Sequence, residues 1–116
     1  MAKSSIPNPM DRRHLIEKDL DPAKSLALAE AYLADGRGSE AVVFFAKAGA
    51  DDRLRALADQ AVESGDAFVL AAVAAVWKDT PGVERWLKLA DAAEAAGKER
   101  YAEMARRHAR SSEDRD

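Results

Sequence analysis

Apolar residues recur along most of this chain at intervals of three and four, which is the spacing of one face of an α-helix. A clear example is the row formed by Leu54, Leu57, Ala58, Ala61 and Val62. Glycines, prolines and capping residues separate such rows and predict helices over approximately 10–20, 22–35, 40–47, 52–63, 67–77, 83–96 and 98–110. The pattern therefore predicts an all-α protein.

Residues that cap helices stand at several of the predicted boundaries. Asp21, Ser39, Asp51 and Asp66 each precede an apolar row, where a short polar side chain accepts a hydrogen bond from the first turn of a helix. Pro22 follows Asp21 and fits the first helical position, because the backbone N–H that proline lacks would have no partner there. We expect these four residues to be N-caps.

The stretch from Ala67 to Trp77 differs from the other rows because it is apolar on every side. A helix of this kind is usually buried all round, so we expect it at the centre of the core. The alternative is that part of it forms a surface for self-association.

A leucine and a glycine eight residues later occur three times with the same local pattern. The leucines are Leu28, Leu57 and Leu89, and the glycines are Gly36, Gly65 and Gly97. The copies are offset by 29 and then by 32 residues. A fixed period of this size is typical of stacked helical hairpins.

These hairpins resemble tetratricopeptide repeats. The matching residues of the first hairpin are Leu28, Tyr32, Gly36, Ala41, Phe45 and Ala48, and those of the third are Trp86, Leu89, Gly97, Ala102 and Ala109. The middle hairpin is degenerate and keeps Leu57 and Gly65. The resemblance implies a short α-solenoid of three hairpins with one extra N-terminal helix. We expect a single repeat domain over 10–110, between a flexible N-terminus (1–9) and a flexible C-terminal tail (111–116).

Composition narrows the classes of function. The chain has 34% charged and 47% hydrophobic residues, which is typical of a folded, soluble protein. It has no cysteine, which excludes disulfides and zinc–thiolate sites. The longest apolar stretch is much shorter than the roughly 20 residues that a membrane-spanning helix needs. The formal net charge of −3 argues against broad affinity for nucleic acids or anionic membranes. We expect a cytoplasmic protein, and the alanine and arginine content suggests a prokaryotic one.

The sequence shows no pattern that predicts catalysis. His14 and His108 stand outside any metal-binding motif, and we interpret both as ordinary surface or packing residues. Ser39 lacks the context of a nucleophile, and Gly36-Arg37-Gly38 is better explained as the end of a helix than as a phosphate loop. We expect no enzyme activity, no cofactor and no metal.

In the tetratricopeptide family the first helix of each hairpin lines a concave groove that binds peptides. The resemblance therefore implies a groove that carries three carboxylates among apolar side chains; its residues are Leu26, Glu30, Leu33, Arg55, Asp59, Val62, Leu87 and Asp91. A basic or amphipathic protein or peptide would suit such a surface. The simpler interpretation is that these acids are merely solvated.

The resulting prediction is a non-enzymatic adaptor that binds a protein or peptide. The alternative is a structural module that associates with itself, for example as a homodimer. A more distant alternative is association with nucleic acid through the basic last helix, where the cationic residues are Lys98, Arg100, Arg106, Arg107 and Arg110.

Overall fold

The computed structural model describes residues 6–77 and 81–114, and within this part it is all-helical with no strand. The seven helices are α1 (Pro9–Glu17), α2 (Pro22–Ala34), α3 (Gly38–Lys47), α4 (Asp51–Ser64), α5 (Ala67–Val76), α6 (Val83–Ala95) and α7 (Glu99–Asp114). The predicted all-α class is therefore confirmed, and each predicted helix has a counterpart. Most of the predicted loop over 78–82 lies outside the described residues.

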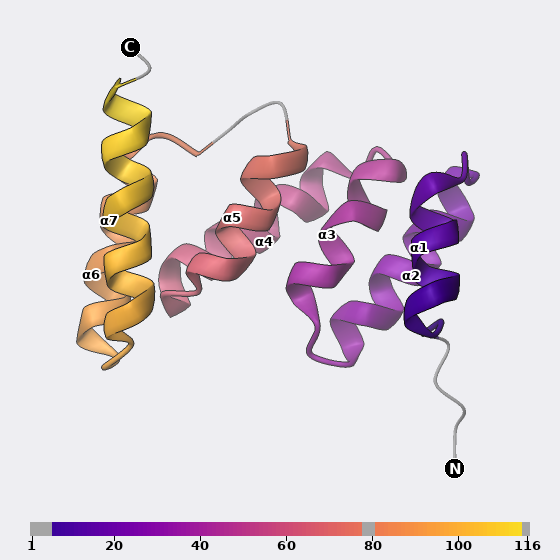
Figure 1. The fold of residues 1–116 in the computed structure, drawn as a ribbon, viewed down its shortest axis with the longest axis horizontal. Coiled ribbons are helices and arrows are strands. Elements are labelled where there is room, and N and C mark those ends of the chain that lie inside the picture. Colours follow the sequence, from indigo (N-terminus) through magenta and orange to yellow (C-terminus); the bar gives the residue numbers. More distant parts are fainter. Residues whose placement is uncertain (1–5, 78–80, 115–116) are drawn as a thin grey trace.

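Consecutive helices pair, and the pairs stand next to one another (Figure 1). α2 packs on α3, α4 on α5 and α6 on α7, while α3 contacts α5 and α4 contacts α6. Figure 1 shows α4 behind α5 and α6 behind α7. Ion pairs join α2 to α4 and α4 to α6. We call these three the back helices.

The core lies between the back helices and helices α3, α5 and α7. It consists of alanines surrounded by aromatic and aliphatic side chains. Ala29, Ala58 and Ala90 are at most 1% exposed, one in each back helix. Small residues at helix crossings let the helix axes approach, and large rings fill the space beside them. Tyr32 stacks on Phe44 with ring centroids 5.6 Å apart.

Helix α1 is joined to this core by an arginine and by two half-buried apolar residues. The Arg12 guanidinium lies over the rings of Tyr32 and Phe44 and donates a hydrogen bond to the carbonyl oxygen of Glu40. No residue of α1 is buried, although Leu15 and Ile16 pack against the core. Ile6 also packs there, so the segment predicted as a flexible N-terminus contributes a core contact, while residues 1–5 lie outside the described residues.

Two of the four predicted N-caps are confirmed. The side chain of Asp21 accepts a hydrogen bond from the backbone N–H of Lys24, and that of Asp66 accepts one from Val69. The predictions for Ser39 and Asp51 are wrong, since the caps are Arg37 and Ala50. These helices begin earlier than expected, and Asp51 instead lies in the first turn, where the helix dipole favours a negative charge.

An ion pair stabilises the start of α3 in place of a side-chain cap. Arg37 donates two hydrogen bonds to the carboxylate of Glu40, at 2.8 and 2.6 Å. These bonds favour the ionised carboxylate and hold the pKa of Glu40 below its ordinary value. Arg37 also lies over the ring of Tyr32, which connects the turn between α2 and α3 to the core.

Two further predictions about the ends and the centre of the molecule are corrected. α7 continues to Asp114, so residues 111–114 of the predicted flexible tail are helical. α5 is not buried all round: Ala67, Leu70 and Val73 are buried, whereas Phe68 is 60% and Val76 39% exposed. The reason is that α5 packs against α3, α4 and α7, and these neighbours leave its outer face uncovered.

Candidate functional site

The predicted groove residues lie on the back helices, and the structure brings most of them to the boundaries between adjacent helices. Val62 is 8% exposed, Leu26 and Leu33 are half-buried, and Leu87 is 45% exposed on α6. Arg55 is exposed and its guanidinium lies over the ring of Trp77, with 5.8 Å between the guanidinium carbon and the ring centroid.

The three predicted carboxylates have different surroundings. Glu30 of α2 forms an ion pair with Arg53 of α4, and Asp59 of α4 forms one with Arg85 of α6, at 3.3 Å. Asp91 of α6 is exposed and forms no ion pair within the described part of the chain. The surface is thus not a continuous acidic stripe, because two of the three charges are balanced by arginines of the next helix.

Shallow depressions follow these two boundaries. Between α4 and α6 the depression has a volume of about 440 Å³ and is lined by Asp59, Val62, Glu63, Arg85, Lys88 and Ala92. Between α2 and the start of α4 the volume is about 330 Å³, and Leu26 and Arg53 are among the lining residues. Both are open and strongly charged, which suits a polar contact better than an apolar ligand.

A second surface lies on the opposite side of the molecule, where α5 and α7 diverge. Phe68 of α5 meets Tyr101 of α7 edge to face, with ring centroids 6.1 Å apart. Toward the other ends of these helices a cleft of about 480 Å³ opens between them, which we call the α5–α7 cleft. It is lined by Ala71, Ala74, Ala75, Pro81, Gly82, Val83, Trp86, His108, Ser111 and Ser112.

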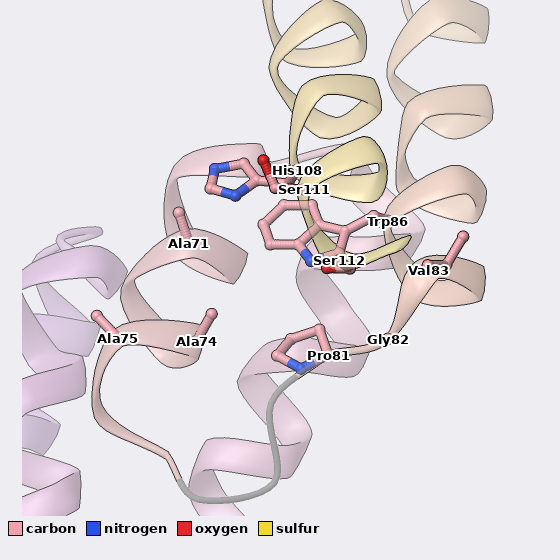
Figure 2. A pocket seen from close by; sticks show the side chains of 10 residues that line it. All are labelled: Ala71, Ala74, Ala75, Pro81, Gly82, Val83, Trp86, His108, Ser111 and Ser112. Atoms are coloured by element: carbon pink, nitrogen blue, oxygen red, sulfur yellow. The ribbon is translucent and has the colours of Figure 1, made fainter. Parts of the chain in front are cut away.

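Figure 2 shows how three helices form the α5–α7 cleft. The alanines project from α5 on one side, while Trp86 of α6 faces them from the other. The His108 ring of α7 stacks on the Trp86 indole at 4.2 Å between centroids and with an angle of 11° between planes. This contact explains His108 as a packing residue: its half-buried ring lies at the cleft and stacks on a Trp86 indole that is itself buried.

The uncovered face of α5 continues the α5–α7 cleft onto the outside of the molecule. Phe68, Ala75 and Val76 are exposed, and no residue of α5 is polar. Tyr101 and Met104 of α7 are half-buried beside it. We call Phe68, Ala75 and Val76 the α5 outer face. The sequence allowed for a surface on this helix but did not indicate which side it occupies, because a helix without polar residues gives no sign of which side points outward.

The basic cluster of the last helix is partly occupied by contacts within the chain. Arg106 forms an ion pair with Glu94 of α6, and Arg107 lies 3.7 Å from Glu103. Lys98 Nζ donates a hydrogen bond to the carbonyl oxygen of Ser64. These contacts reduce the positive charge that α7 presents to solvent.

Comparisons with known proteins give no assignment. No family model matches the chain, and neither a curated protein nor a solved structure matches it significantly. Within the described residues, no three His, Cys, Asp or Glu side chains are grouped as a metal site would require. None of the described helices combines the length and the apolar character needed to cross a membrane.

Proposed function

We propose that this chain is a non-enzymatic adaptor in which three helical hairpins form a short solenoid that binds another protein. The observation that carries the proposal is the α5 outer face: a helix without polar residues leaves Phe68 60% exposed, and alanines of the same helix line the α5–α7 cleft further along. Large exposed apolar groups that adjoin a cleft are typical of protein-binding surfaces.

The chemistry of the α5–α7 cleft suits an amphipathic helix or an extended apolar segment of the partner. Its walls combine accessible alanine side chains with the half-buried His108 ring, so they offer apolar contact and room for a close approach. Exposed Arg100 lies on α7 and would favour an acidic group at the edge of the partner. Phe68 would be the main anchor, because aromatic residues dominate the energetics of such interfaces.

The groove on the back helices is the other surface that such an adaptor would use. It is less favoured because Glu30 and Asp59 already have arginine partners, which leaves Asp91 as the unpaired member of the three predicted carboxylates. A basic partner would have to compete with these two ion pairs.

We expect that replacing Phe68 and Val76 by alanine weakens partner binding by at least tenfold, because two exposed apolar side chains are removed from the interface. The measurement is capture from a native lysate by the immobilised chain, followed by affinity measurement with the captured protein. Met10→Ala is the matched control, since Met10 is 70% exposed on α1, away from the α5–α7 cleft. Equal binding by the double variant, or no specific capture by the wild-type chain, would contradict the proposal.

A further inference from the structure

The back helices are joined by two ion pairs in which the acidic and basic residues are arranged in the same order. Glu30 of α2 pairs with Arg53 of α4, and Asp59 of α4 pairs with Arg85 of α6. In both pairs the carboxylate belongs to the earlier helix and the arginine to the next one. The same arrangement of charges thus repeats across two successive helix boundaries.

Both pairs also occupy the same position relative to the repeated leucines. Each carboxylate follows the leucine of its own helix by two residues, as Glu30 follows Leu28 and Asp59 follows Leu57. Each arginine precedes the leucine of its helix by four residues, as Arg53 precedes Leu57 and Arg85 precedes Leu89. One rule therefore describes both contacts.

The rule leaves one charge without a partner at each end of the row. On α6 the carboxylate position is Asp91, two residues after Leu89, and on α2 the cationic position is Lys24, four residues before Leu28. Both side chains are exposed, and neither forms an ion pair within the described residues. The two unpaired charges have opposite signs.

The surroundings of these two residues are complementary as well. Leu87 lies one helical turn before Asp91 and is 45% exposed, although it is a large apolar side chain. Beside Lys24 the surface of α2 consists of small residues, with Ala23 and Ala27 exposed and Ala31 half-buried. A leucine on one edge and a surface of alanines on the other permit close packing of two helices. We call these surfaces the α6 edge (Leu87 and Asp91) and the α2 edge (Ala23, Lys24, Ala27 and Ala31).

We propose that the α6 edge binds the α2 edge of a second copy of this chain, head to tail, with Asp91 of one copy paired to Lys24 of the next. The contact would continue the row of ion pairs that already joins α2 to α4 and α4 to α6. Because the two edges differ, every added copy leaves both kinds of edge free, and assembly grows with concentration without closing at a dimer.

The association is expected to be weak and sensitive to salt. An exposed ion pair contributes little in water, and ions screen it further. The α1 helix leaves the α2 edge accessible, since Lys24 and Ala27 remain exposed beside it. This proposal concerns a surface separate from the α5 outer face, so each can fail without the other.

Reversing either charge should weaken the association about tenfold, because an attractive pair becomes a repulsive one. The measurement is sedimentation velocity over a range of protein concentrations at low and high salt. Wild-type chains should show a sedimentation coefficient that rises with concentration, most strongly at low salt. Lys24→Glu and Asp91→Lys should each reduce this rise, while Asp52→Lys, at an exposed residue of α4, controls for the net-charge change of Asp91→Lys.

The combined variant Lys24→Glu, Asp91→Lys provides the decisive result. It restores opposite charges, but only between copies, because residues 24 and 91 lie on α2 and α6 at opposite edges of α4. Recovery of wild-type association would support the proposal. Three results would overturn the proposal. The wild-type chain could stay monomeric at every concentration, the double variant could fail to recover association, or Phe68→Ala rather than the charge reversals could abolish it.

Discussion

Replacing Gly65 by alanine should lower the free energy of unfolding by about 2–5 kcal/mol, the sum of a backbone effect and a steric effect. Gly65 ends α4 with φ of +73°, a left-handed conformation that costs an L-residue about 1–2 kcal/mol. A β-carbon there would also lie 2.6 Å from the α-carbon of Ala93, which belongs to the backbone of α6. Backbone atoms cannot relieve such a clash by a side-chain rotation, so α4 and α6 would have to move apart.

The control for this prediction is Gly97→Ala. Gly97 has φ of +77°, but an added β-carbon would meet nothing within 4 Å, so it should show the backbone cost alone. Thermal unfolding of both variants measures the difference, and Gly65→Ala should melt roughly 10 °C or more below the wild type. Equal melting temperatures for the two variants would mean that α4 and α6 do not approach each other as closely as described.

Replacing Phe45 by alanine should cost about 3–5 kcal/mol, which is the usual range for deleting a fully buried phenylalanine. Phe45 is 0% exposed on α3, which contacts α2, α4 and α5. Removing the ring would leave a cavity where these helices meet. The helices are held by their other contacts, so they can move only partly into the empty space. Chemical denaturation at equilibrium measures the loss, as a shift of the transition to lower denaturant.

Phe68→Ala is the matched control, because it removes the same ring from a position that is 60% exposed. Its cost should be about 1 kcal/mol or less, mainly from the edge-to-face contact with Tyr101. A Phe45→Ala variant that unfolds like the wild type would remove this residue from the core. A Phe68→Ala variant with a loss as large as that of Phe45→Ala would show that the α5 outer face is structural.

The sequence was sufficient to predict the helices because their signals are local. Several helix boundaries are set within a single turn of the chain, either by a glycine in the left-handed conformation or by an N-cap aspartate. The glycines are Gly36, Gly65 and Gly97, and the aspartates are Asp21 and Asp66. Trp86, which matches the tetratricopeptide pattern in the third hairpin, is 2% exposed. The caps at Ser39 and Asp51 were wrong because helices α3 and α4 begin one or two residues earlier, with no side-chain cap.

The surfaces were harder to predict because they depend on contacts between helices. The acidic character of Glu30 and Asp59 is visible in the sequence, but their pairing with Arg53 and Arg85 requires the back helices to be adjacent. A signal was present, since an arginine precedes Leu57 and Leu89 by the same four residues. The exposure of α5 left no such signal, because only the positions of α3, α4 and α7 decide which of its sides is covered.

The central claim is that a partner protein covers the α5 outer face, and site-specific photo-cross-linking tests it most directly. A photoreactive phenylalanine analogue at position 68 would be compared with the same analogue at position 10, where the native Met10 is 70% exposed on α1 against 60% for Phe68. We expect position 68 to cross-link the partner and position 10 to give little product. Cross-linking from position 10 alone, or from position 68 only to another copy of this chain, would contradict the claim.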